Sequence, residues 1–165
     1  PPPNFTTSLN NENYVINAFT KNPANPTNFV QAIYIHGRSG RTNEILTAIN
    51  TFSPLAGEDP KNLTLIKNAY GLIQRWEDKA LIDEKLTTLT PDDYAPWFDL
   101  AQTRLQLQQT NRATQALKEA LTRFKKGTES SSAVNIIDAI RTNAIFVPLR
   151  EHPEIKPFLE EAEEN

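Results

Sequence analysis

The residues best suited to chemistry in this sequence are two histidines and a short glycine-containing segment. His36 and His152 are the only histidines, and they lie in different segments of the chain. Neither has carboxylates at a spacing typical of a metal site, so we interpret His36 as a helix-end residue beside a turn and His152 as a capping or surface residue. The segment Gly37–Gly40 (GRSG) lacks the Lys-Ser/Thr pair and the preceding strand of a phosphate-binding loop. A turn explains it better.

The remaining reactive residue types give no catalytic pattern either. The chain has no Cys, which excludes a Cys nucleophile, a thiolate zinc site and a disulfide. Asp92 and Asp93 suit the positive end of a helix dipole. We interpret the acidic residues near the end of the chain as a solvated terminus. We therefore predict no catalytic residue, no cofactor and no metal, and we expect a protein that is not an enzyme.

Length and charge narrow the class of partner. The chain has 165 residues, a net charge of −3 and a pI near 5.5, which argues against nucleic acid or an anionic membrane as the main partner. No apolar run approaches the roughly 18 residues of a membrane span, and no signal-peptide pattern is present. The chain contains no Met and begins with three prolines, so we interpret it as a mature or excised segment. The compartment stays open: we expect a soluble domain, cytoplasmic by default or excised from a larger membrane-anchored protein.

Residues 90–126 have the clearest element pattern, which predicts two antiparallel helices. Thr90 can cap the first helix and Pro91 suits its first turn. Apolar residues then recur at helical spacing, with small residues where two helices would approach closely. The apolar and small residues concerned are Trp97, Leu100, Ala101, Leu105, Ala113, Ala116, Leu117, Ala120, Leu121 and Phe124.

This stretch resembles the tetratricopeptide repeat, a helix–turn–helix unit of about 34 residues. The resemblance lies in an aromatic residue, a Leu and small residue after it, and a small–bulky–small series in the second helix: Trp97, Leu100, Ala101, Ala113, Leu117 and Ala120. Two residues depart from the family pattern. Gln108 stands where the turn usually has Gly, and Lys125 stands near the closing Pro. The resemblance implies a right-handed superhelical solenoid of antiparallel helix hairpins, so the expected fold class is all-α.

Two weaker copies of the pattern lie upstream. We assign repeat 1 to residues 25–55, repeat 2 to residues 59–89 and repeat 3 to residues 90–126. Each copy begins with a capping residue followed by proline, at Pro26, Pro60 and Pro91, and the anchors of the first helices are Phe29, Leu65 and Trp97. Both series have spacings near the family period, which predicts a repeat array.

The rest of the chain is expected to flank this array in a single domain over residues 11–165. Residues 1–10 are predicted to form an extended linker. Residues 11–24 are predicted to form a helix, either an N-terminal cap or the second helix of a lost repeat. Residues 131–165 resemble the tail that closes many bacterial arrays, and we expect them to form capping helices because the last repeat of a solenoid exposes an apolar face.

The family resemblance also implies a function, which is binding of a partner protein or peptide by the first helices of the repeats. At the family's groove positions stand Val30, Tyr34, Ile66, Tyr70, Ile73, Phe98, Gln102 and Leu105. These residues are expected to form an apolar, aromatic groove of a scaffold or adaptor. Alternatively, they pack against the chain's own N-terminal helix or tail, and the protein is a passive structural or oligomerising appendage of a larger membrane-anchored or secreted protein. Nucleic acid binding and direct membrane insertion are not expected, and the oligomeric state stays open.

Overall fold

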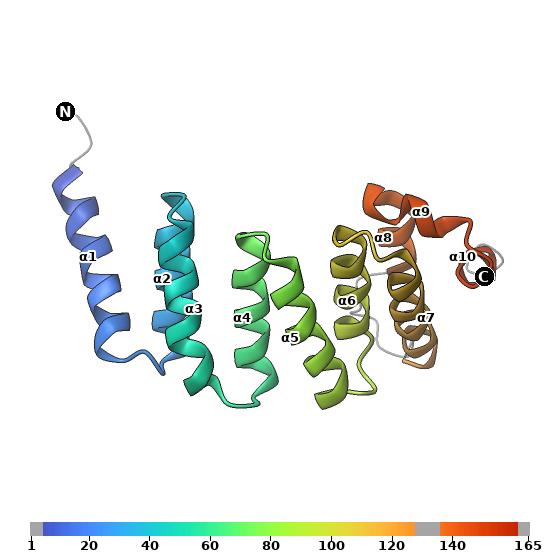
Figure 1. The fold of residues 1–165 in the computed structure, drawn as a ribbon, viewed down its shortest axis with the longest axis horizontal. Helices are drawn as coiled ribbons and strands as arrows, with labels where there is room; N and C mark the ends of the chain where they lie inside the picture. The colour runs from blue at the N-terminus through green and yellow to red at the C-terminus, as the bar shows by residue number, and fades with distance from the viewer. Residues whose placement is uncertain (1–4, 128–135, 162–165) are drawn as a thin grey trace. The chain divides into compact units, whose positions relative to one another are not determined.

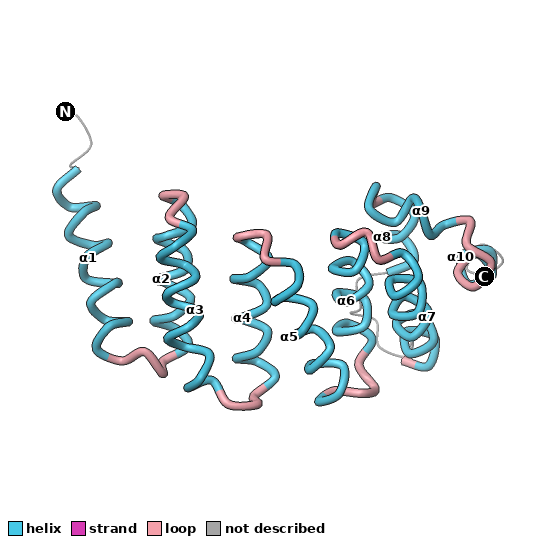
Figure 2. The backbone as a smooth tube through the Cα atoms, in the orientation of Figure 1, coloured by secondary structure: helices cyan, strands magenta, loops and turns pink. Residues whose placement is uncertain are grey.

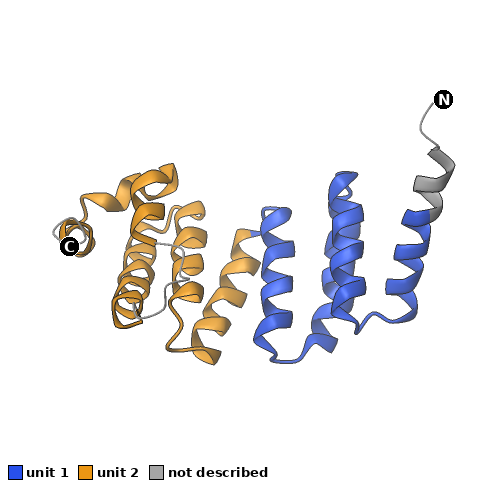
Figure 3. Cartoon of the chain, turned by 180° about the vertical axis from the view of Figure 1, so that it is seen from behind, with its two compact units in different colours: residues 1–75 blue, residues 76–165 orange. Residues whose placement is uncertain are grey.

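The computed structural model describes residues 5–127 and 136–161. These residues form ten α-helices and one short 3-10 helix, with no strand among them (Figures 1 and 2). The expected all-α class is therefore confirmed. The chain divides into two compact units, residues 1–75 and residues 76–165 (Figure 3). We expected a single domain over residues 11–165. The boundary between the two units falls inside the segment assigned to repeat 2.

The first unit contains helices α1 (Phe5–Lys21), α2 (Pro26–Arg38), α3 (Thr42–Ala56) and α4 (Pro60–Leu72). Helix α2 packs against α1 and α3, and α4 packs against α2 and α3. Three aromatic rings join α1, α2 and α3 in the core. The rings of Phe29 and Phe52 stack with centroids 4.3 Å apart, and Phe19 lies 6.1 Å from Phe29.

The second unit contains α5 (Trp76–Leu89), α6 (Tyr94–Gln106), α7 (Thr110–Lys126), α8 (Ile136–Thr142), η1 (Ala144–Phe146), α9 (Val147–Arg150) and α10 (Lys156–Glu161). Helices α6 and α7 approach closely because Ala101, Ala113 and Ala120 are fully buried between them, as predicted. The short C-terminal elements add Ile140, Phe146 and other buried residues to the core that α6 and α7 form.

The helices repeat with a period of 34 residues. Helices α2, α4 and α6 each contain 13 residues and begin at residues 26, 60 and 94. Helices α3, α5 and α7 begin at residues 42, 76 and 110. The backbone turns between them share the same geometry at Gly40, Gln74 and Gln108, whose φ angles are 64°, 57° and 57°. Gln108 thus adopts the left-handed conformation for which the sequence pattern favours glycine.

Two of the three predicted helix starts are confirmed. The side chains of Asn25 and Asp59 accept hydrogen bonds from the first backbone N–H groups of α2 and α4. The prediction for the third start is wrong, because Asp93 caps α6 by accepting a hydrogen bond from Ala95 N at 2.9 Å. Thr90 instead donates its hydroxyl proton to the carbonyl of Leu86 at the end of α5.

Two further sequence predictions need correction. Helix α1 begins at Phe5, so residues 5–10 are helical and the predicted linker over residues 1–10 was too long; residues 1–4 lie outside the described residues. In α4 the residue 34 positions after Phe29 is Leu63, which is buried, whereas the predicted anchor Leu65 is only partly buried. A shift of two residues rotates a side chain by about 200° around a helix, so the predicted register placed the wrong face of α4 in the groove.

Candidate functional site

An apolar groove lies between α2 and α4 in the first unit. It has a volume of about 310 Å³ and is lined by Phe29, Val30, Ile33, Tyr34, Leu65, Asn68, Ala69 and Leu72. Phe29 and Ala69 are buried and form its floor. Three large apolar side chains of the lining stay open to solvent, since Val30, Tyr34 and Leu72 are 44%, 62% and 55% exposed. A local cluster of exposed apolar side chains of this kind is typical of a binding surface.

Asn68 is the one polar residue in the lining. Its side-chain amide forms no hydrogen bond with another described residue. An amide side chain offers an acceptor oxygen and two N–H donors. Asn68 can therefore pair with a peptide group of a bound chain while the surrounding residues contact apolar side chains.

Gly37 in the last turn of α2 lies beside Leu72, the last residue of α4. A Cβ atom added to Gly37 would lie 3.0 Å from Leu72 Cδ2, so glycine leaves room for this leucine side chain. The next residue, Arg38, holds its guanidinium group 5.7 Å above the centre of the Tyr34 ring. A cation therefore lies beside an aromatic wall of the groove.

The structure brings only some of the predicted groove residues together. Val30 and Tyr34 line the groove, but Tyr70 and Ile73 do not. Ile66 is fully buried in the core, so its prediction as a groove residue is wrong. The cause is the two-residue register shift in α4: with the 34-residue period, Asn68 is the position equivalent to Tyr34. The Asp59 cap fixes that period in the sequence and would have identified Asn68.

In the second unit the equivalent face of α6 is partly covered by the chain itself. The ring of Phe98 stacks on that of Phe146 from η1, with centroids 5.2 Å apart, and Leu105 packs against the hydrophobic core. The alternative that these residues pack on the tail therefore holds for Phe98. Gln102 lines a small polar pocket of about 240 Å³ together with Trp76, Lys79, Thr103, Gln106, Asn143 and Ile145.

A buried polar cluster joins α5 to α6 beneath that pocket. Asp83 is fully buried, and its Oδ2 atom lies 2.7 Å from Lys79 Nζ and 2.7 Å from Thr103 Oγ1. Lys79 also donates a hydrogen bond to Thr103. Lys79 and Thr103 thus pair with the Oδ2 atom of the buried Asp83 carboxylate, and a buried charge needs such partners, so we assign the cluster to structure.

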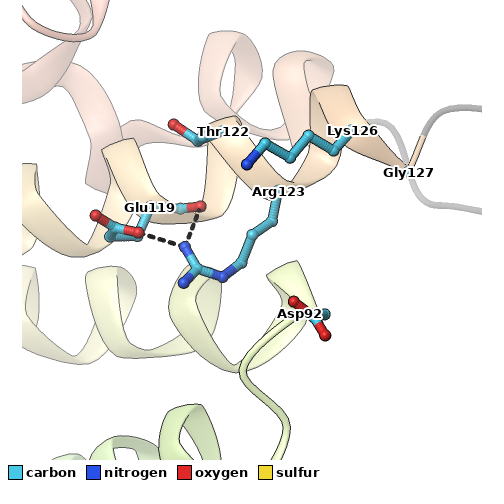
Figure 4. A pocket seen from close by; sticks show the side chains of 6 residues that line it. All are labelled: Asp92, Glu119, Thr122, Arg123, Lys126 and Gly127. Atoms are coloured by element: carbon cyan, nitrogen blue, oxygen red, sulfur yellow. Dashed lines mark hydrogen bonds and ion pairs between the residues drawn. The ribbon is translucent and has the colours of Figure 1, made fainter.

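A second polar hollow of about 360 Å³ lies beside the C-terminal end of α7 (Figure 4). Its central cation, Arg123, is already bound within the protein. The guanidinium group bonds to the Glu119 carboxylate and to the carbonyls of Glu119 and Pro91, and it lies 4.7 Å above the Trp97 ring. We infer a structural role for Arg123 because these contacts hold its guanidinium group against the protein.

The two histidines lie in different units and have local roles. His36 is 8% exposed in the last turn of α2, and its Nδ1 atom has no hydrogen-bond partner among the described residues. Burial and the positive charge of Arg41 lower the pKa of His36. His152 Nδ1 accepts a hydrogen bond from the backbone N–H of Glu154, consistent with the predicted capping role.

Within the described residues, no three His, Cys, Asp or Glu side chains are placed to bind a metal ion. None of the described helices has the length and apolar character needed to cross a membrane. Comparison with models of known protein families gives no match, and comparison with curated proteins gives none either. The features that bear on function are therefore the spacing of the helices and the groove between α2 and α4.

Proposed function

We propose that this chain is a protein–protein interaction module built from tetratricopeptide-like repeats. In this proposal the hairpins form a right-handed superhelical solenoid, and the groove between α2 and α4 binds an extended segment of a partner protein. The 34-residue period of the helices, caps and turns supports the family assignment. The groove, in which three exposed apolar side chains surround a free amide, is the observation that carries the binding function.

The apolar part of the groove supplies the affinity. Val30, Tyr34 and Leu72 leave large apolar surfaces in water, and covering them with an apolar side chain of a partner is favourable. Tyr34 suits a central contact residue because its ring gives a large contact area and loses little conformational entropy on binding.

The amide of Asn68 favours an extended partner over a helical one. In a helix, the backbone N–H and C=O groups already bond to each other. In an extended segment those groups are free, and each must find a new partner when the segment leaves water. Asn68 supplies a donor and an acceptor for one peptide group, so it discriminates between the two conformations.

The competing function is a passive structural or oligomerising appendage. The stacking of Phe146 over Phe98 supports it for the second unit, where the tail covers the equivalent helix face. In the first unit no described segment covers Tyr34, which is 62% exposed. This difference between the two units favours binding by the first.

A peptide-display selection on the purified protein tests the proposal. The selected peptides are measured by fluorescence polarisation against the parent, Tyr34→Ala and Asn68→Ala. Tyr34→Ala is expected to weaken binding by about 1–3 kcal/mol, and Asn68→Ala by about 0.5–1.5 kcal/mol, the net value of a hydrogen bond. Tyr14→Ala is the matched control, since Tyr14 is 73% exposed on α1 and does not line the groove.

Conformation is tested with the same peptides. A peptide locked in a helix by a side-chain crosslink is expected to lose affinity, whereas the linear form retains it. Circular dichroism of each variant confirms that helical content is kept. Selection of no peptide, or equal binding by the parent and Tyr34→Ala, contradicts the proposal and leaves the passive appendage.

A further inference from the structure

We infer that the partner segment carries a carboxylate beside its apolar side chain, and that Arg38 binds this carboxylate next to Tyr34 at the edge of the groove. The inference rests on the proposed function and adds the charge and the orientation of the partner. A neutral apolar segment would fill the groove without using the cation that lies over Tyr34.

Arg38 is available for such a contact. Its side chain is exposed, and it forms no ion pair with another described residue. The neighbouring Arg41, by contrast, is paired with Glu12, with Nη2 and Oε2 3.6 Å apart. Arg38 is the last residue of α2, and its guanidinium group lies over Tyr34, which lines the groove. A group that leaves the groove beside Tyr34 therefore lies near the guanidinium group.

The contact with Tyr34 also positions the arginine. The guanidinium group lies 5.7 Å above the centre of the ring, a distance at which a cation is attracted to the face of an aromatic ring. Arginine presents paired N–H donors that match a carboxylate. Because the stacked side chain has lost part of its freedom before binding, less conformational entropy is lost when the carboxylate arrives.

Local charge outweighs net charge at this site. The net charge of −3 alone would favour a basic partner. Charges more than about 8–10 Å away are largely screened at physiological salt, however, and no residue that lines the groove is charged. Arg38 is exposed and lies over the ring of Tyr34, which lines the groove, so its charge is placed to act on a bound segment.

The expected effect on affinity is small and the effect on selectivity is larger. An exposed ion pair changes affinity by about two- to fivefold, far less than an apolar contact residue. Opposite charge at a fixed place nevertheless selects one orientation and one class of partner, because the wrong charge is repelled.

A charge-exchange selection tests the inference. The same random peptide-display library is selected on the parent and on Arg38→Glu. Parent-selected peptides are expected to carry Asp or Glu at a fixed spacing from an apolar residue, and Arg38→Glu is expected to select Lys or Arg at that position. An acidic parent-selected peptide should bind Arg38→Glu about two- to tenfold more weakly at low salt, and 0.5 M NaCl should remove the difference.

Two further variants make the result decisive. Arg112→Glu makes the same change in net charge at an exposed position on α7 that does not line the groove, and it should keep the acidic preference. Arg38→Gln removes the charge without reversing it and decides the matter if Arg38→Glu fails to fold. Tyr34-dependent peptides that carry no acidic residue, or that bind the Arg38 variants as tightly as the parent, overturn this inference and leave the proposed function standing. If no Tyr34-dependent peptide is selected, both fail.

Discussion

The turn residues allow a reciprocal test of the repeat geometry. Gly40 and Gln108 occupy equivalent positions with φ angles of 64° and 57°, and glycine adopts this left-handed conformation without strain. We therefore expect Gln108→Gly to stabilise the protein and Gly40→Gln to destabilise it. A Cβ atom at Gly40 would meet no atom within 4 Å, so the second effect comes from the backbone and not from a clash.

The magnitude follows from two opposing contributions. A non-glycine residue in the left-handed region costs roughly 1–3 kcal/mol. Glycine loses more conformational entropy on folding, which costs about 0.5–1 kcal/mol. The difference is about 1 kcal/mol at each site, with opposite signs for the two variants, which corresponds to about 2–4 °C in Tm for a chain of this size.

Urea unfolding followed by two signals locates each effect. The only two tryptophans, Trp76 and Trp97, lie in the second unit, so their fluorescence reports on the unit that contains Gln108. Circular dichroism reports on both units. Gln115→Gly, an exposed position inside α7, is the matched control and should destabilise by about 1 kcal/mol. Destabilisation by Gln108→Gly, or no effect of Gly40→Gln, would refute the argument from backbone conformation.

Two further predictions concern the core. Burial and the positive charge of Arg41 lower the pKa of His36 in the folded protein below the ordinary value of 6.5. Protonation of His36 therefore favours the unfolded chain, and the free energy of unfolding should fall as the pH drops below 6.5. His36→Leu should reduce the difference in urea midpoint between pH 7.5 and pH 5.5, while the control His152→Gln should keep that difference. Ala113→Leu should overpack the α6–α7 contact and cost about 1–3 kcal/mol, measured by urea unfolding with tryptophan fluorescence, and an unchanged midpoint would show that this contact is not tight.

The sequence predicts best where a side chain acts on its own backbone. Asn25 and Asp59 cap α2 and α4 by bonding to N–H groups two residues ahead, so the signal lies within a few residues. The third start shows the limit of this reasoning. Thr90-Pro91 has the same local signature, but the hydroxyl of Thr90 bonds back to Leu86, and only the neighbouring helix decides between the two uses.

The candidate site was predicted less completely because its register and its exposure depend on distant residues. In the second copy, the charged residues Lys67 of α4 and Asp83 of α5 are buried, so an apolar pattern alone could not fix the register of this copy. Burial of Asp83 depends on Thr103, which lies on another helix. The cover over Phe98 likewise comes from a residue of the C-terminal segment, which no local pattern of α6 reveals.

The buried cluster of Lys79, Asp83 and Thr103 has a consequence for assembly. Helices that share one length and one spacing can exchange neighbours, within a chain or between two chains, because each offers a similar apolar face. The positions of Lys79 and Asp83 are occupied in the other two hairpins by apolar residues, and the position of Thr103 is occupied in α2 and α4 by Ile35 and Ala69. If α5 paired with either of those helices, a buried charge would lose its hydroxyl partner. The cluster thus makes the pairing of α5 with α6 specific, which favours the native order of the helices and opposes domain swapping.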